Sequence, residues 1–341
     1  MKTPPQRDAL FVSLIVTITF ALTLAAPFDM KSVPTWHLFY TQKLFAGGPL
    51  LFSLAGYLWS NKAYRLTIKE RAHILSDRFD LLIYPFILLS LVAYTLLYIF
   101  ADQEGCPLQG LWSWLFMPRS YPDPLSLLSF LPALFVIFVV ALLLPHPLSI
   151  KQNTLLYTGA LLLHLSYTLL PIDPTKDPLA ILLGLSNLHF FFLGSLLQKI
   201  YRKGIPSRIT LSALLLFHVV LAIRILTPRD APWAHLLSVL YFTFLLIIIY
   251  GAGSKVGCWI QKPPFYYWAR HLFPFSVFAL LGNLVIGRWI IPLLPMDYAV
   301  MPHLLLLSVF LLNLLLPLPF IHLYHKRKSR NDRQEDLNNH L

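Results

Sequence analysis

Charge and cysteine are what this sequence has least of. Only 12% of its 341 residues are charged, while 57% are hydrophobic, whereas a soluble domain needs about 25% charged residues to cover its surface. Because long apolar runs recur along the whole chain, this shortage excludes a soluble domain and predicts a polytopic membrane protein. The two cysteines, Cys106 and Cys258, form no Cys-x-x-Cys pair, so neither a structural zinc site nor a redox motif is supported.

Acidic residues are also scarce, with 15 Asp and Glu against 27 Lys and Arg and a net charge of +12. The basic residues stand in short segments beside apolar runs, where they orient membrane helices and meet anionic lipid headgroups. No long aromatic and basic patch lies outside those segments. We therefore expect membrane lipids as partners and exclude nucleic acid.

Ten apolar windows have the length that a hydrocarbon core requires of a helix, about 17–23 residues. The expected spans cover residues 9–28, 42–60, 80–100, 124–145, 154–172, 178–198, 208–226, 233–252, 273–293 and 300–322. With the N-terminus placed inside, roughly three quarters of the Lys and Arg residues fall in inner segments, and the bias alternates from loop to loop. The predicted fold class is an all-α polytopic membrane protein with about ten transmembrane helices and both termini cytoplasmic.

Residues 1–325 are predicted to form a single transmembrane domain, and the polar residues 326–341 a disordered cytoplasmic tail. The first span loosely imitates a secretory signal, with Leu24-Ala25-Ala26 near its end. We interpret it as a retained helix because the apolar run is long for a signal. The predicted outer segment 101–123 has two interpretations, an aromatic segment at the headgroups or a lid over a site that binds sugar.

Histidines at membrane depth are candidates for chemistry, because ionisable residues there are costly. His164 shares a helix face with Tyr167, and His189 shares one with Ser186. A neutral imidazole at either position could accept a proton from a hydroxyl as a general base, or it could hydrogen-bond a neighbouring helix. We take His164 and His189 as the catalytic candidates, while His218 is more isolated.

Arg224 and Arg288 lie toward the outer ends of their spans. Each could extend its guanidinium to the headgroups, or it could bind an anionic group such as a lipid-linked phosphate. We take both as candidate contacts for an acceptor or anion. No residue is predicted to bind a metal.

The stretch 44–86 consists of two apolar arms joined by a charged loop that carries Arg78. Its segments Pro49-Leu50-Leu51-Phe52 and Ala55-Gly56-Tyr57-Leu58, with Arg78 and Tyr84-Pro85 after them, resemble motifs of the acyltransferase 3 family. Phe190-Phe191-Phe192-Leu193-Gly194 resembles a further motif of that family.

The resemblance implies about ten membrane helices and transfer of an acyl group from cytoplasmic acyl-CoA, with acetyl-CoA the expected donor, to an envelope glycan. It gives Arg7 and Arg78 the role of donor binding. The family usually has a histidine about three helical turns after the first-helix arginine, and this chain has none near Ile18-Thr19-Phe20. The histidine of a later family motif is absent from residues 274–282 as well.

Two functions therefore stay open. The first is an inner-membrane O-acyltransferase that moves a small acyl group to a hydroxyl of an envelope or exported polysaccharide, with His164 or His189 replacing the missing histidine. Its expected partners are a glycan or lipid-linked saccharide acceptor and a polysaccharide synthase or export complex. The second is an inactive relative that acts in polysaccharide export or beside a glycan synthase, which the two missing histidines favour.

Overall fold

The computed structural model describes residues 11–12, 15, 18, 47–60, 66–100, 110–120, 128–169, 173, 176–201, 203–228, 231 and 233–260. The chain divides into two compact units, one of residues 1–12 and 46–262 and the other of residues 13–45 and 263–341. Apart from Ile15 and Ile18, all described residues belong to the first unit. Arg7, Arg288, the expected last two spans and the expected tail lie outside the described residues.

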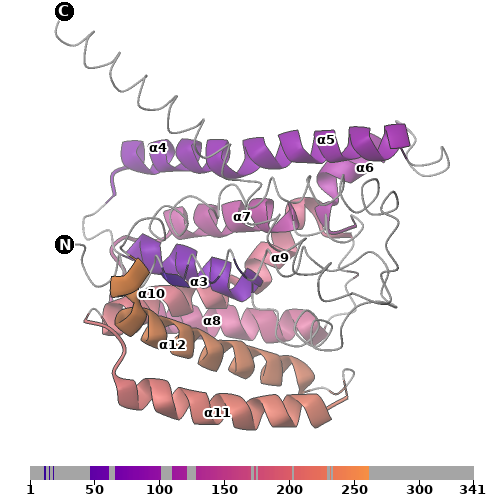
Figure 1. Ribbon diagram of the computed structural model, residues 1–341. Coiled ribbons are helices and arrows are strands. Elements are labelled where there is room, and N and C mark those ends of the chain that lie inside the picture. The colour runs from indigo at the N-terminus through magenta and orange to yellow at the C-terminus, as the bar shows by residue number, and fades with distance from the viewer. Residues whose placement is uncertain are drawn as a thin grey trace, which may run out of the picture. The chain divides into compact units, whose positions relative to one another are not determined.

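The described part of the chain is helical and contains no strand, as the all-α prediction requires. Its elements are α3 (Gly47–Ser60), α4 (Ile68–Arg78), the π-helix η3 (Phe79–Ile83), α5 (Tyr84–Phe100), α6 (Leu111–Phe116), the 3-10 helix η5 (Pro118–Ser120), α7 (Phe130–Leu143), α8 (Ile150–Leu169), the 3-10 helix η8 (Pro178–Ala180), α9 (Ile181–Ser186), α10 (Leu188–Ile200), α11 (Ser207–Leu226) and α12 (Ala234–Ile260). The long helices run back and forth beside one another (Figure 1). Within this arrangement α10 packs against α3 and α8, α7 against α9, and α11 against α12.

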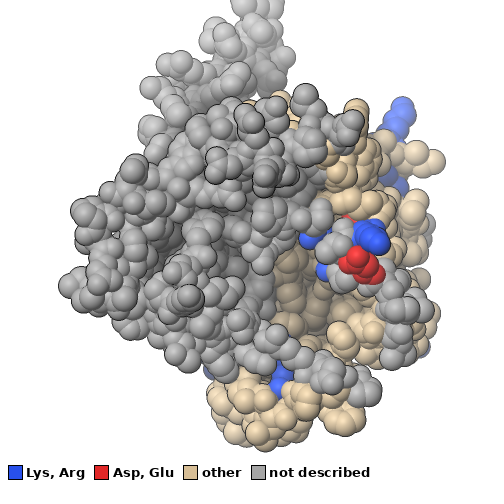
Figure 2. Space-filling view, turned by 90° about the vertical axis from the view of Figure 1, so that its right-hand side faces the viewer, with Lys and Arg blue, Asp and Glu red and all other residues tan. Residues whose placement is uncertain are grey.

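Two of the described helices, α11 and the 20 residues Ala234–Gly253 of α12, are long and apolar enough to cross a membrane. The segments Pro178–Ser186 and Leu188–Ile200 form a third candidate, bent by 47° at the break between them. The chain is thus an all-helical protein with membrane-spanning capacity, while ten spans and the orientation of the termini remain predictions. Over the described residues visible in Figure 2, most of the surface is neither basic nor acidic.

Residues 68–100 form one helical segment whose exposed side chains change from charged to apolar. Thr67 and Glu70 start α4 with a capping box, in which each side chain accepts the other's backbone N–H. In α4 the exposed side chains include Lys69 and Asp77. Beyond it most of them are apolar: Phe79, Leu81, Tyr84, Ile87, Leu88, Leu91 and Val92 are exposed, together with the polar Asp80 and Thr95. The predicted charged loop is wrong from residue 68 on, because the capping box begins a helix that the sequence does not interrupt.

Helices α3 and α10 touch backbone to backbone. A Cβ at Gly56 would lie 1.8 Å from the carbonyl oxygen of Phe191, and a Cβ at Gly194 would lie 1.9 Å from that of Ser53. Small residues allow this close approach between membrane helices. The stretches around Gly56 and around Gly194 are therefore packing partners.

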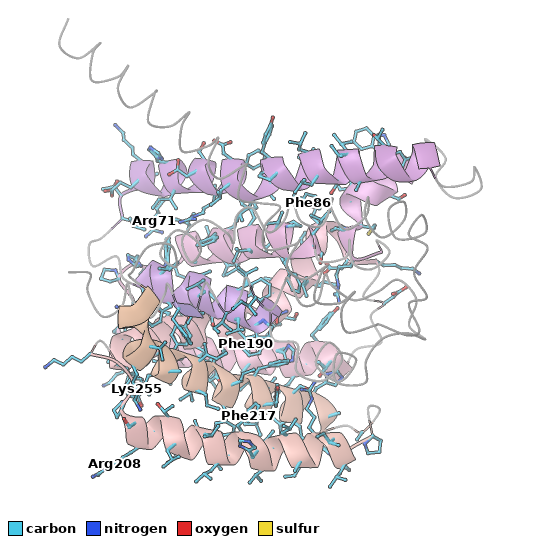
Figure 3. The ribbon with its side chains drawn as sticks, in the orientation of Figure 1. Arg71, Phe86, Phe190, Arg208, Phe217 and Lys255 are labelled. Carbon is cyan, nitrogen blue, oxygen red and sulfur yellow. The ribbon has the colours of Figure 1, made fainter. Side chains whose placement is uncertain are left out.

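One basic residue from each of three helices lies at the same end of the described bundle. Arg71 of α4, Arg208 at the start of α11 and Lys255 near the end of α12 all lie at the left in Figure 3. Arg71 donates from Nη1 to the carbonyl of Leu142 in the last turn of α7, where a helix dipole favours a cation. In the predicted topology all three residues belong to inner segments, and the fold places them at one end.

Candidate functional site

The site begins with the break between α9 and α10, which occurs at Asn187. The Asn187 backbone lies outside the helical region, with φ −100° and ψ 5°. Its side-chain amide donates to the carbonyl of Leu183 at 2.8 Å, a local bond that competes with continuation of the helix. The N–H of Phe190 bonds the Asn187 carbonyl at 3.1 Å. The Ser186 carbonyl, which a continuous helix would pair with Phe190, is thereby left to other donors.

Two histidines from different helices hydrogen-bond to the Ser186 carbonyl. Nδ1 of His164 in α8 and Nδ1 of His189 in α10 each lie 2.9 Å from the Ser186 oxygen. Their ring centroids are 4.6 Å apart. Since a carbonyl oxygen only accepts, both Nδ1 atoms carry the proton, and in each neutral ring Nε2 keeps its lone pair. The arrangement fixes one tautomer for both rings.

The two rings differ in exposure. His189 is completely buried, and its Nε2 has no hydrogen-bond partner among the described residues. His164 is half-buried. A buried polar atom without a partner costs about 1–3 kcal/mol, so Nε2 of His189 does not itself stabilise the fold. A lone pair held at a fixed position in an apolar surrounding can accept a proton from a hydroxyl.

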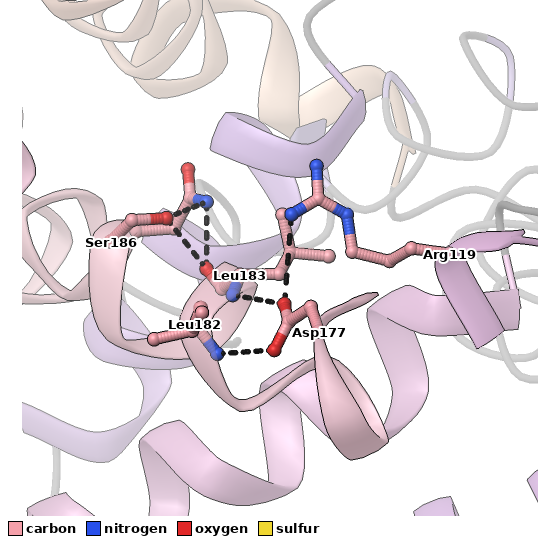
Figure 4. Close-up of polar contacts among 6 residues, drawn as sticks. Arg119, Asp177, Leu182, Leu183 and Ser186 are labelled. Carbon is pink, nitrogen blue, oxygen red and sulfur yellow. Dashed lines mark hydrogen bonds and ion pairs between the residues drawn. The ribbon is translucent and has the colours of Figure 1, made fainter. Parts of the chain in front are cut away.

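A second polar group, which the sequence analysis missed, lies at the start of α9. Asp177 is completely buried, and its carboxylate accepts the backbone N–H groups of Leu182 and Leu183, both at 2.8 Å. Arg119 of η5 lies 3.6 Å from the same carboxylate (Figure 4). The sequence does carry a signal for this group, because Asp followed by Pro178 before an apolar run is typical of a helix start.

Helices α8 and α10 are also joined by a buried polar contact away from the histidines. Ser195 Oγ donates to Asn153 Oδ1 at 3.1 Å, and both residues are buried. A contact of this kind fixes how two helices sit against each other. It thereby sets the register that brings His164 opposite His189.

Arg78 does not join the histidine pair. Its guanidinium lies 4.7 Å from the ring centroid of Phe138, and that ring lies 6.2 Å from Phe191 of α10. Burial lowers the pKa of Arg78 and the neighbouring Asp77 carboxylate opposes that shift, yet arginine stays charged in proteins. Arg78 therefore presents a partly buried cation where the surface changes from charged to apolar.

The remaining described candidates lie on the α11–α12 pair. Arg224 places its guanidinium 4.8 Å from the ring centroid of Tyr241 and 5.5 Å from that of Phe242, so it binds the face of α12. His218 is exposed, and its Nδ1 bonds the Leu214 carbonyl of its own helix at 2.7 Å. Neither residue contributes to the Ser186 carbonyl.

Within the predicted outer segment, residues Leu111–Phe116 form the short helix α6, in which Trp112 is 69% exposed. An exposed tryptophan here fits both an aromatic segment at the headgroups and a lid over a site that binds sugar. Within the described residues no group of three His, Cys, Asp or Glu side chains could hold a metal ion.

The sequence matches no protein-family model and no curated protein, and the structure matches no solved structure.

Proposed function

We propose that this chain is an inner-membrane O-acyltransferase of the acyltransferase 3 type. It moves a small acyl group, with acetyl the expected one, from cytoplasmic acyl-CoA to a hydroxyl of an envelope or exported polysaccharide. The observation that carries the proposal is the pair of Nδ1–H bonds from His164 and His189 to one carbonyl. This arrangement supplies the base that the first-helix histidine supplies in the family.

The chemistry follows from the tautomer. Nε2 of one imidazole takes the proton of the acceptor hydroxyl while the hydroxyl oxygen attacks the thioester carbonyl carbon. A C–O bond forms, the C–S bond breaks, and the released CoA thiolate takes up the proton. The Ser186 carbonyl stabilises the imidazolium through the Nδ1–H bond, as an acceptor behind a general base does.

The positions of the candidates along the helices suggest how the two substrates approach. His164 lies roughly 20 Å from the start of α8 and roughly 8 Å from its end, at 1.5 Å per residue. The start of α8 follows the last turn of α7, where Arg71 bonds the Leu142 carbonyl, and Arg71 lies at the same end of the bundle as Arg208 and Lys255 (Figure 3). With that basic end in the cytoplasm, the donor enters beside Arg78 and the acceptor reaches the pair from the opposite side.

The test is mass analysis of envelope and secreted polysaccharides from cells with and without the gene. The proposal expects loss of a defined acyl mass in the deletion, restored by the wild-type gene. The double variant His164→Ala/His189→Ala should restore nothing, although it is present in the membrane in normal amount. His218→Ala is the matched control and should restore the acyl mass fully, because its imidazole bonds only its own helix.

Donor binding has its own test. Arg78→Ala should raise KM for acyl-CoA, because a charge-assisted bond to phosphate is lost, and should change kcat less. The control is Lys69→Ala, which removes an exposed cation from the same helix. Equal KM values for the two variants would exclude Arg78 from the donor site.

One observation favours the second function, polysaccharide export. The bend of 47° between α9 and α10 places irregular backbone inside an apolar segment, and such broken helices form substrate sites in transporters. In that case the deletion would leave acylation unchanged, and glycan would accumulate inside the cell.

A further inference from the structure

Asp177 is the only completely buried carboxylate among the described residues. Burial of an ionised carboxylate costs several kcal/mol unless hydrogen bonds and an opposite charge compensate. Asp177 has both, because two backbone N–H groups of α9 and the guanidinium of Arg119 surround it (Figure 4). Because its carboxylate has hydrogen-bond and charge partners, Asp177 holds the backbone of Leu182 and Leu183 in place.

The backbone between Asp177 and α9 is strained. Leu179 and Ala180 have positive φ angles of 51° and 53°, a conformation that L residues rarely adopt and that costs of order 1–3 kcal/mol each. Such strain persists only where the surrounding structure holds it. The Asp177 carboxylate reaches across this turn to the N–H groups of Leu182 and Leu183, and the N–H of Ala180 bonds the Asp177 carbonyl within it.

The far end of α9 carries the histidine site. This helix has six residues, so its two ends are only about 8 Å apart. At Gly184 it rests directly on α7, since a Cβ there would lie 2.7 Å from the Ala133 carbonyl oxygen. Its last residue is Ser186, whose carbonyl accepts both imidazoles. Asp177 and α7 together therefore determine where that carbonyl lies.

We propose that Asp177, paired with Arg119, is a positioning residue that holds the Ser186 carbonyl between His164 and His189 and so fixes both rings as Nδ1–H tautomers. Arg119 belongs to η5, at the end of the aromatic segment that contains α6. The pair thus connects this segment to the histidine site. The tautomer does not depend on the enzymatic activity, whereas its effect on catalysis rests on the proposed function.

The tautomers can be measured by ¹⁵N NMR of the full chain with ring-labelled histidine in lipid nanodiscs. The signals of the two rings are assigned from their loss in His164→Ala and His189→Ala. In wild type both should be neutral with a protonated Nδ1. In Asp177→Asn at least one ring should lose that signature, because the amide places an NH2 donor where one of the two carboxylate oxygens now accepts an α9 N–H. A spectrum like that of wild type would overturn the proposal.

Asp173→Asn is the matched control, since the same change is made four residues away. Asp173 is exposed and lies 4.0 Å from Lys176, an ion pair of the exposed kind that is worth little. In the Asp173→Asn variant, the rings of His164 and His189 should both remain Nδ1–H tautomers. If Asp173→Asn altered them as much as Asp177→Asn, the effect would not be specific to the buried carboxylate, and the proposal would be wrong.

Arg119 provides a second variant in case Asp177→Asn does not fold. Its side chain is 24% exposed, so its replacement disturbs the interior less. Arg119→Gln should shift the histidine signals in the same direction, and Arg119→Lys should return them toward wild type because it keeps the charge. Identical spectra for wild type and Arg119→Gln would contradict the proposal.

Acyl transfer separates this proposal from the proposed function. Asp177→Asn should lower kcat roughly tenfold to hundredfold, as small misplacements of catalytic groups do, with little change in KM for acyl-CoA. A changed tautomer in Asp177→Asn together with no acyl transfer by wild type would sustain the positioning role and reject the enzyme. Normal acyl transfer and unchanged tautomers in Asp177→Asn would reject the positioning role and leave the enzyme standing.

Discussion

His189 and His218 lie in helices of similar apolar character, yet their surroundings differ. His189 is buried and bonds a carbonyl that a second histidine also bonds. His218 is exposed and bonds the carbonyl four residues before it in its own helix. The difference arises from Asn187, which breaks the α9–α10 segment and frees the Ser186 carbonyl, whereas α11 is continuous from Ser207 to Leu226.

The two regions also differ in how closely their helices approach. Around the site, α3 and α10 are in backbone contact at Gly56 and Gly194. In the α11–α12 pair, the nearest atoms to a Cβ at Gly251 belong to the side chain of Thr210. The first region is therefore fixed by backbone, and the second by side chains that can adjust. A rigid surrounding suits a site that must hold two imidazoles in place.

The largest effect should come from the α3–α10 contact. Gly194→Ala should lower the free energy of unfolding by about 3 kcal/mol or more, because the added methyl meets a backbone carbonyl that cannot rotate away. Gly251→Ala should cost less, since the Thr210 side chain has a second rotamer available. Denaturant unfolding in detergent micelles, followed by circular dichroism, measures both.

The control for these variants is Gly159→Ala in α8. No atom lies within 4 Å of a Cβ at that position, so alanine should stabilise the helix by about 0.5–1 kcal/mol. Losses of equal size at positions 159, 194 and 251 would contradict the contrast between the two regions.

A smaller effect is expected from Arg224 in the α11–α12 pair. Arg224→Gln should destabilise the protein by about 1 kcal/mol, because the guanidinium loses its cation–π contact with Tyr241 and Phe242. It should leave the acyl mass unchanged if this contact is the whole role of Arg224. Loss of acylation at normal stability would instead support the predicted anion contact. Arg208→Gln, which changes an exposed arginine of the same helix, is the control for charge.

The smallest change in stability is expected at the site itself. His189→Leu should unfold within about 1 kcal/mol of wild type, because loss of the Ser186 hydrogen bond is offset by removal of a buried Nε2 without a described partner. The same variant should abolish acyl transfer. A loss of about 3 kcal/mol would mean that His189 is a structural residue that joins two helices, which is the other role the sequence allowed.

The sequence predicted the helical class because apolar runs of membrane length need only composition to be recognised. It did not predict that the helix begins at residue 68 rather than near residue 80, because the charged segment was interpreted as a loop and Thr67 and Glu70 were not considered as a capping box. The bend at Asn187 was also missed. An asparagine inside an apolar run does not reveal whether its amide bonds its own backbone.

At the site, the sequence singled out His164 and His189 for their depth and for the polar residues on their own helix faces. Their meeting at one carbonyl could not be foreseen, because it depends on the register of α8 against α10 and on the break between α9 and α10. Asp177 and Arg119 were not proposed, since both fall in segments interpreted as loops between spans. Charged residues in such segments are usually exposed, and only tertiary packing buries Asp177.

The most direct test of the paired site is a double-mutant cycle at positions 164 and 189, with the rate of acyl transfer in membranes as the measured quantity. If both rings serve one proton transfer, His164→Ala, His189→Ala and the double variant should lose activity by similar factors, because residues that act as a unit are strongly non-additive. If the loss in the double variant equals the product of the two single losses, or if either single variant keeps full activity, the two histidines do not form one site.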